Sequence, residues 1–500
     1  MGLHKMPALA NSSRFDVALA RRSGLWQVAA MQSRLIVPKI ILWCVAFAIL
    51  ALSITTRVPK WLTDFDQSFY ITIAYDLDRH GVFSNGIFDQ TDSTAAVPPP
   101  GMFFGPVYPG FVYAAMQIDP RFREAVACAV EAQHKTRDHK TCEVYARPIH
   151  LLHSFFLALG VIAIASMAEM IAGGRFAFWA AGLAATVGLV FEVDLFSFVM
   201  TESLVFSLYS IMAACWVAGL KTGRRFWFII AGCVLGVLCL TRASYLVLAP
   251  AIAVLTLASG YFALAPAKQS WRDASAFLLA FVVVFTPWIA RNAITLGKPA
   301  VSEEYGSAAL IERFAFNDMS LREALLAFPY CVPQIGPAAV NALAAPGAMD
   351  RFTYDTPGSF FAEGRALRSA LVAKHGKLDP VMGTLMREEM ERNWWRHVAI
   401  SLPLAWCGSF VSGAWGLVFF PLFLAGSAMA LRHRKPLLLL YAAPAFVMVA
   451  LHAGVANHYP RYNLGLIGPY AAAGACVLLA IARRRRDAPH SQLRSTAPGA

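Results

Sequence analysis

Carboxylate and arginine side chains that could act on an anionic substrate lie near the ends of several long apolar segments of this sequence. A carboxylate within reach of a hydroxyl group can take its proton, and arginines bind phosphate oxygens through charge-assisted hydrogen bonds. Both types together at one membrane face suit a substrate that is itself an anionic lipid. These residues, with one nearby histidine, are Asp64, Asp66, Glu192, Asp194, Glu202, Arg242, Arg291, Arg461 and His458.

The composition indicates that most of the chain lies in a membrane. Of the 500 residues, 58% are hydrophobic and 15% are charged, with a mean hydropathy of +0.53. A helix needs about 20 apolar residues to cross about 30 Å of hydrocarbon. Such segments occur at roughly 38–56, 149–171, 176–195, 201–220, 226–241, 245–265, 273–290, 416–431, 436–453 and 463–482. We therefore expect an all-α membrane protein with about ten transmembrane helices.

The net charge of +13 reflects orientation in the membrane. With the N-terminus inside, the inner segments hold 20 Lys or Arg and two acids, whereas the remainder has 23 basic and 28 acidic residues. This bias is the positive-inside rule, so no nucleic-acid partner is expected. The first apolar run follows nearly forty polar or mixed residues, which is typical of an uncleaved signal anchor. We predict a multi-pass protein of a bacterial inner membrane with both termini in the cytoplasm.

This topology divides the chain into parts with different roles. The spacing of Phe69, Ile73 and Leu77 in the first outer loop predicts a helix at the membrane surface. The second outer segment mixes helix formers with Pro and Gly breaks, so we expect several short helices there. The parts are a cytoplasmic segment 1–37, a transmembrane core 38–290 with the outer loop 57–148, an outer helical segment 291–415, C-terminal transmembrane helices 416–482 and a basic tail 483–500.

Cys128 and Cys142 differ from the cysteines of the apolar segments. Both lie in a polar part of the first outer loop, fourteen residues apart, and an oxidising periplasm permits a disulfide there. The spacing leaves open whether they pair. The sequence has no CxxC, HExxH, Walker A or GxGxxG motif, which argues against the commonest zinc and nucleotide sites.

A series of short motifs resembles the GT-C glycosyltransferases. Directly after the first apolar segment, Asp66-Gln67-x-x-Tyr70-x-x-x-Ala74-x6-Gly81 looks like the first-loop motif of the bacterial branch related to protein mannosyltransferases, aminoarabinose transferases and lipopolysaccharide-core transferases. The likeness continues with TyrProGly at 108–110, ThrGlu at 201–202, LeuThrArg at 240–242, ProTrp-x-x-ArgAsn at 287–292 and ProArgTyr at 460–462. It covers most of 38–482. No single motif is specific, but their order and predicted side of the membrane agree.

The resemblance implies transfer of a sugar, hexosyl or pentosyl, from a polyprenyl-phosphate-linked donor to an acceptor hydroxyl on the periplasmic side. The acceptor would be a glycolipid, a polysaccharide or a protein, and the anomeric carbon would be inverted. Asp66 matches the catalytic Asp of the family and is the expected general base. Arg242, Arg291 and Arg461 are expected to bind the donor phosphate, because fixed cations stabilise the charge left on it.

Gln67 departs from the commonest pattern, in which an acid follows the catalytic Asp. Asp64 could replace that acid only if the stretch is extended, because on a helix its side chain would point about 200° from that of Asp66. No cofactor is clearly required, but a divalent metal such as Mg or Mn could share the phosphate-binding role. Glu192 and Asp194 are then the candidate ligands, since the pair resembles a second acidic motif of some GT-C enzymes. Further site candidates are Gln67, Tyr70, Glu202 and His458.

Each assignment has a structural alternative. Asp66 could cap the helix that follows it, the arginines could anchor helix ends at the interface, and Glu202 could stabilise a helix N-terminus. A polytopic transporter or flippase of lipid-linked saccharides would share the hydropathy, although repeat symmetry and broken mid-membrane segments are not evident. A non-catalytic envelope assembly protein would not need Asp66.

Overall fold

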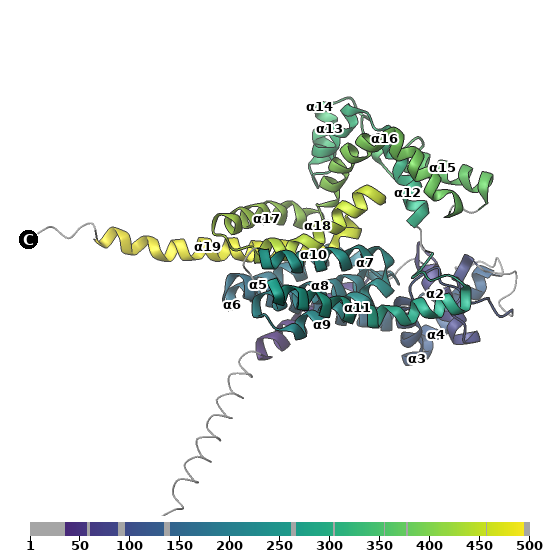
Figure 1. Cartoon of the computed structure of the whole chain (residues 1–500), viewed down its shortest axis with the longest axis horizontal. Helices are drawn as coiled ribbons and strands as arrows, with labels where there is room; N and C mark the ends of the chain where they lie inside the picture. The colour runs from purple at the N-terminus through teal and green to yellow at the C-terminus, as the bar shows by residue number, and fades with distance from the viewer. Residues whose placement is uncertain are drawn as a thin grey trace, which may run out of the picture.

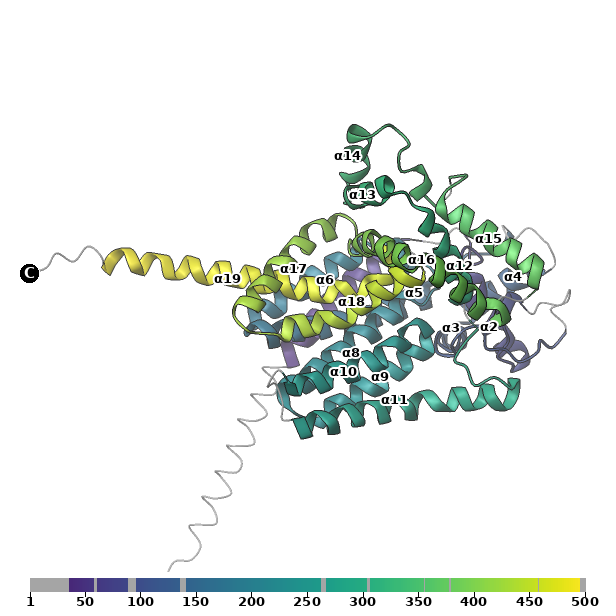
Figure 2. The ribbon, with the colours of Figure 1, turned by 45° about the horizontal axis from the view of Figure 1, so that its top comes forward.

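In the computed structural model, long apolar helices run side by side, and smaller helices gather at one end of them (Figures 1 and 2). The structure describes residues 36–57, 61–88, 96–134, 141–261, 267–303, 306–354, 356–376, 379–456 and 458–494. Within these ranges the secondary structure is helical, with turns and loops but no strand. The all-α prediction is therefore confirmed.

Ten apolar helices in the described part of the chain correspond to the ten predicted segments. Two are shorter, α6 (Arg175–Val190) and α9 (Arg225–Thr241), and eight are long and apolar enough to cross a membrane. The eight lie at Ile36–Thr55, α5 (Arg147–Ala172), α8 (Glu202–Thr222), η3 with α10 (Ala243–Val247 and Leu248–Tyr261), α11 (Ala267–Leu296), α17 (Ala414–Arg432), α18 (Leu437–Val455), and η6 with α19 (Pro460–Leu466 and Ile467–Arg494). The chain is a multi-pass membrane protein.

Helix α8 occupies the centre of the bundle. It packs against α5 on one side and α9 on the other, and α11 packs against α9. Nearly all of its residues are buried, including Glu202 at its first turn. The first turn of α8 thus places the Glu202 carboxylate among the helices. A buried negative charge needs a positively charged partner.

The first outer loop folds into α2 (Gln67–His80), η1 (Gly86–Phe88), α3 (Val107–Ile118) and α4 (Pro120–His134). Gly81 caps the C-terminus of α2: its left-handed backbone (φ +67°) lets its N–H bond to the carbonyl oxygen of Leu77. Helix α2 packs against α3 and α4. A disulfide between Cys128 and Cys142 joins α4 to the chain ahead of α5, so the pairing that the sequence left open is formed.

The second outer segment forms α12 (Gly306–Phe314), η4 (Ala315–Asp318), α13 (Leu321–Tyr330), α14 (Gly336–Leu343), η5 (Asp350–Phe352), α15 (Phe360–His375) and α16 (Asp379–Gly408). The fully buried guanidinium of Arg313 ties this segment to the bundle. It donates to the carbonyl oxygen of Ala453 at 2.7 Å, to that of His397 at 3.1 Å and to the hydroxyl of Ser401 at 3.0 Å. These bonds join α12 to α16 and α18.

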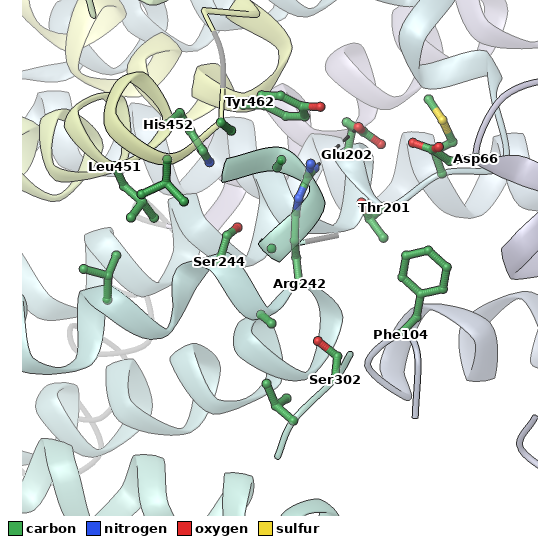
Figure 3. Close-up of a pocket in the computed structure, with 18 of the residues that line it drawn as sticks. Asp66, Phe104, Thr201, Glu202, Arg242, Ser244, Ser302, Leu451, His452 and Tyr462 are labelled. Carbon is green, nitrogen blue, oxygen red and sulfur yellow. Dashed lines mark hydrogen bonds and ion pairs between the residues drawn. The ribbon is translucent and has the colours of Figure 1, made fainter. Parts of the chain in front are cut away.

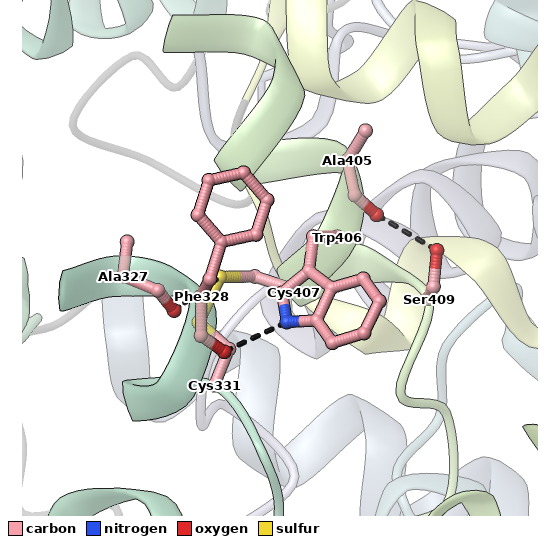
Figure 4. The surroundings of a disulfide bond; sticks show 7 residues. All are labelled: Ala327, Phe328, Cys331, Ala405, Trp406, Cys407 and Ser409. Atoms are coloured by element: carbon pink, nitrogen blue, oxygen red, sulfur yellow. Dashed lines mark hydrogen bonds between the residues drawn. A yellow bond between two sulfur atoms is a disulfide. The ribbon is translucent and has the colours of Figure 1, made fainter. Parts of the chain in front are cut away.

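A second disulfide, between Cys331 and Cys407, was not foreseen from the sequence (Figure 4). It joins the end of α13 to α16, across 76 residues of chain. The indole N–H of Trp406 donates to the carbonyl oxygen of Phe328 at 2.7 Å beside it. The outer segment is therefore fixed to itself as well as to the bundle.

Candidate active site

A cavity of about 440 Å³ lies where the first outer loop meets the bundle (Figure 3). The first outer loop, the start of α8, the connection from α9 to η3, the chain around α12, the end of α18 and η6 all contribute to its walls. Its polar and aromatic lining includes Asp66, Tyr70, Phe104, Thr201, Glu202, Arg242, Ser244, Ser302, His452 and Tyr462. Four of the residues singled out from the sequence thus line one cavity, and these are Asp66, Tyr70, Glu202 and Arg242.

Asp66 faces this cavity and does not cap a helix. It stands directly before α2, yet its side chain makes no capping hydrogen bond. The preceding Phe65 has a φ of +54°, which turns the chain sharply at this point. About two fifths of the Asp66 side chain (41%) is exposed, and its Oδ2 lies 4.0 Å from Nη2 of Arg461. The structure therefore does not support the alternative in which the Asp66 side chain caps α2.

The surroundings of Asp66 shift its proton affinity. Burial raises the pKa of Asp66 above its ordinary value, the positive charges of Arg461 and Arg242 oppose the rise, and the negative charge of Glu202 adds to it. A carboxyl group with a raised pKa holds a transferred proton better than an ordinary aspartate does. That property suits a general base.

Gln67 and Asp64 hold the turn that presents Asp66. Gln67 is completely buried, and its Oε1 accepts a hydrogen bond from the backbone N–H of Val199 at 2.8 Å. Its Nε2 donates to the carbonyl oxygens of Asp64 and Trp61. Oδ2 of Asp64 accepts from the N–H of Trp61 at 3.0 Å. Neither residue lines the cavity, so the structure does not bring Asp64 to the place of a second catalytic acid.

Hydrogen bonds from α5 fix the chain that leads into α8. His150 and His153 bond through ring nitrogens to carbonyl oxygens at the end of the short helix α7 (Val193–Ser197), at 2.8 and 3.0 Å. Gln67 binds the next part of the same chain at Val199. The position of Glu202 is thus set from both the bundle and the first outer loop.

Two arginines contact the aromatic ring of Tyr462, and one of them lies beside Asp66. Nη1 of Arg242 lies 3.5 Å from Oε1 of Glu202, and the Arg242 guanidinium stands 4.8 Å from the centre of the Tyr462 ring. The Arg461 guanidinium stands 5.0 Å from the same centre and donates to the Tyr462 hydroxyl at 3.1 Å. Two arginines on one tyrosine ring suit an anionic ligand such as a phosphate.

A glycine lets the first outer loop approach the end of α9. A Cβ at Gly105 would stand 2.2 Å from the carbonyl oxygen of Leu240, closer than any atoms can pack. Helix α9 ends one residue later at Thr241, and Arg242 adopts an extended backbone (φ −151°, ψ 114°). The loop at Gly105 therefore packs directly against the end of α9, next to Arg242.

The structure does not place Arg291 beside Arg242, as the sequence predicts for a shared phosphate site. Nη1 of Arg291 donates to the carbonyl oxygen of Gly101 at 2.6 Å and to Oδ1 of Asn292 at 2.9 Å. Its guanidinium also stands 4.9 Å from the ring centre of Trp288. Arg291 does not line the cavity; it fastens α11 to the first outer loop. The sequence could not separate it from Arg242, because both follow apolar segments on the same predicted side.

The residues proposed for a metal do not fit one. Glu192 and His458 line a second cavity of about 400 Å³, where burial raises the pKa of Glu192 and hydrogen bonding from Ser412 opposes the rise. Asp194 is exposed and pairs with Arg57 at 3.5 Å. Among the described residues, no group of three or more His, Cys, Asp or Glu could hold a metal ion. The carboxylates of Glu192 and Asp194 therefore contact different residues.

Two further cavity residues belong to motifs of the sequence. Tyr462 belongs to the ProArgTyr motif, directly after Arg461. Thr201 directly precedes Glu202 in the ThrGlu pair. His452 has no such signal, since it lies in an otherwise apolar helix, where its Nδ1 bonds to Oδ1 of Asn463 at 2.9 Å.

Comparison with known proteins finds structural likenesses but no sequence match. No protein-family model matches the chain, and no curated protein does. The chain is similar to the archaeal oligosaccharyltransferase AglB from Archaeoglobus fulgidus, solved with an inhibitory peptide and a dolichol-phosphate. The TM-score is 0.46 with 11% identity, covering 92% of this chain and 52% of the other, so this chain spans about half the length of AglB.

The chain is also similar to ArnT from Cupriavidus metallidurans bound to undecaprenyl phosphate. The TM-score is 0.38 with 14% identity, covering 86% of this chain and 77% of ArnT. Both proteins belong to the GT-C superfamily, which the sequence motifs resemble.

We expect Gly105→Ala to destabilise the protein by about 1–3 kcal/mol, as over-packing typically does, because the new methyl group meets a backbone oxygen. Gly110→Ala in α3 is the matched control, since nothing lies within 4 Å of a Cβ there and alanine favours a helix. Thermal unfolding of both variants in detergent measures the effect. A Tm of Gly105→Ala equal to that of the wild type would contradict the close approach.

Proposed function

We propose that this protein is a membrane glycosyltransferase that moves a hexosyl or pentosyl group from a polyprenyl-phosphate-linked donor to an acceptor hydroxyl. The acceptor is a glycolipid, a polysaccharide or a protein. The observation that carries the proposal is that Asp66 and Arg242 line one cavity of a membrane-helix bundle, with Arg461 4.0 Å from the Asp66 carboxylate. A base beside two cations matches what transfer from a phosphate-linked donor requires.

Asp66 acts as the general base in this proposal. The acceptor hydroxyl oxygen attacks the anomeric carbon while its proton passes to Asp66, and the bond between that carbon and the phosphate oxygen breaks. The electron pair of this bond stays on the phosphate. Attack from the side opposite the leaving phosphate inverts the anomeric carbon. The raised pKa of Asp66 supports the role.

Arg242 and Arg461 stabilise the negative charge that collects on the leaving phosphate. Hydrogen-bond donors that are already in position where charge develops lower a barrier without reorganisation. Tyr462 contacts both guanidinium groups and Glu202 pairs with Arg242. These neighbours limit the freedom of the two arginines before the donor binds.

The apolar wall of the cavity supports a lipid-linked donor. Leu451 and Val455 come from α18, Val247 from η3 and Val301 from the chain after α11. Because these helices are apolar enough to span a membrane, a prenyl chain can reach the cavity from the bilayer. The positive-inside bias supports a bacterial inner membrane with both termini in the cytoplasm and this cavity on the periplasmic side.

We expect Asp66→Asn to abolish transfer, because the amide cannot take the hydroxyl proton; loss of a general base typically lowers a rate by about 10²–10⁴-fold. A deletion strain is complemented with the wild type or the variant at matched membrane abundance. Mass spectrometry of the envelope glycolipids and glycoproteins then reports the product. The wild type should restore a species heavier by one sugar, and Asp66→Asn should not.

Asp64→Asn is the control for that experiment. An asparagine side-chain oxygen can still accept from the N–H of Trp61, so this variant should restore the product. Full restoration by Asp66→Asn would remove Asp66 as the base. If no glycan differs between the deletion and wild-type strains, the alternative of a lipid-linked saccharide transporter takes precedence.

The pH dependence of transfer should respond to Arg461. Asp66 acts as a base only when ionised, so kcat/KM should fall as the pH drops through its pKa. Arg461 lowers that pKa by its positive charge, so Arg461→Gln should raise it and move the acid limb of the kcat/KM profile to higher pH. Arg461→Lys, which keeps the charge, should leave the limb close to that of the wild type. An acid limb that stays in place in Arg461→Gln would argue that Asp66 does not control it.

A further inference from the structure

Large apolar side chains stand exposed on the second outer segment, which the sequence places outside the spans. Exposed apolar patches commonly mark a contact with another molecule or with a membrane. Each of these residues is between 56% and 77% exposed. They are Leu321 and Leu325 of α13, Ile335 directly before α14, Leu343 of α14, and Trp394, Trp395, Val398 and Leu402 of α16. We call these eight residues the outer apolar group.

On α16 the members of the group follow one face of the helix. Trp395, Val398 and Leu402 are three and four residues apart, which places them on the same side. Ile400 and Leu404, on the opposite side, are buried in the core that α16 forms with α13, η4 and α15. The exposed face of α16 is therefore not the face that packs within the protein.

Helix α13 divides in the same way. Leu321 and Leu325 are four residues apart on one face, and Ala327 points about 200° away from Leu325 and is completely buried. Cys331, one turn after Ala327, forms the disulfide with Cys407 of α16 (Figure 4). The core and the disulfide hold one face of α13 against α16, so Leu321 and Leu325 face outward.

Helices α13 and α14 lie beside the bundle and not beyond its end (Figures 1 and 2). In both views the long helices run across the picture, and α13 and α14 stand to one side of them, level with α10 and α18. Helices α2, α3, α4 and α15 lie further toward the outer end. The lipid that surrounds the spans therefore reaches the level of α13 and α14.

The sequence of α16 changes from charged to apolar at Trp394 and Trp395. Five of the six residues at 387–392 are charged, whereas 398–407 has no charge. Tryptophan is enriched where a protein passes from water into lipid. A turn of five residues, 409–413, then leads to α17, which is long and apolar enough to span a membrane. The exposed face of α16 is thus continuous along the chain with a span.

Neither α13 nor α14 can cross the membrane. They have 10 and 8 residues, and a span needs about 20. Short helices with an exposed apolar side lie in the plane of the interface, with that side in the lipid.

We propose that lipids of the outer leaflet cover the outer apolar group. Helices α13 and α14 lie in the membrane interface, and Trp394 and Trp395 stand at the level of the lipid headgroups. The continuity of α16 with a span favours lipid over a second protein chain as the occupant. This contact goes beyond the proposed sugar transfer and does not depend on it.

The lipid contact also supports one wall of the first cavity. Arg313 of α12 donates to the carbonyl oxygen of His397 and to the hydroxyl of Ser401, both on α16. Gly306 and Ala309 of the same helix α12 line the first cavity. Seating α16 on the membrane therefore helps to fix α12 where it borders the cavity.

Photo-crosslinking at α13 and α14 tests the proposal. The full chain carries either Leu325→p-benzoylphenylalanine or Leu343→p-benzoylphenylalanine, since both positions are exposed and leave room for a large ring. Each protein is reconstituted into vesicles of phosphatidylethanolamine and phosphatidylglycerol and irradiated, and mass spectrometry identifies the adducts. We expect phospholipid adducts at both positions.

Val372→p-benzoylphenylalanine is the matched control. Val372 is an exposed aliphatic residue of α15, which lies further toward the outer end than α13 and α14 (Figure 1), so we expect no lipid adduct there. A wild-type Tm shows that each labelled chain is folded. The inference is overturned if neither leucine position gives a lipid adduct, if both crosslink to a second copy of the chain instead, or if Val372 gives an equal yield. None of these readouts requires sugar transfer, so the proposed function is tested separately.

Discussion

One buried amide, that of Gln67, fixes the first outer loop to the membrane helices, and the geometry of the site depends on it. The amide accepts from the N–H of Val199 and donates to two carbonyl oxygens of the preceding turn. Leaving a buried partner unpaired costs about 1–3 kcal/mol. A carboxylate can only accept, so an acid at this position would lose the two donated bonds. The departure from the commonest motif thus has a structural reason, and Asp66 is placed as its consequence.

The charges around Asp66 are balanced. Asp66 and Glu202 supply two negative charges, and Arg242 and Arg461 supply two positive ones. Their contacts are long, at 4.0 Å between Asp66 and Arg461 and 3.5 Å between Glu202 and Arg242. Partial burial strengthens the attraction of these two cations for a phosphate. The long contact with Arg461 leaves Asp66 able to receive a proton.

Hydropathy predicted the apolar helices, because membrane crossing depends on local composition. The charge bias predicted which ends of these helices lie on the same side. The gathering of Asp66, Glu202 and Arg242 at one end also followed, since each stands at the same predicted end of its segment. The local sequence could not predict the direction in which each side chain points. Arg291 stands at the same end but turns to backbone carbonyls of the loop. The disulfide between Cys331 and Cys407 spans 76 residues, and no spacing rule links so distant a pair.

The proposed function requires a phosphate bound by Arg242 and Arg461 beside Asp66. The most direct measurement is a cryo-electron microscopy map of the full chain in lipid nanodiscs with undecaprenyl phosphate added. The account predicts phosphate density within hydrogen-bonding reach of both guanidinium groups, with the prenyl chain along the apolar wall of the first cavity. Density for the phosphate at Arg291, or elsewhere away from these two arginines, would contradict it.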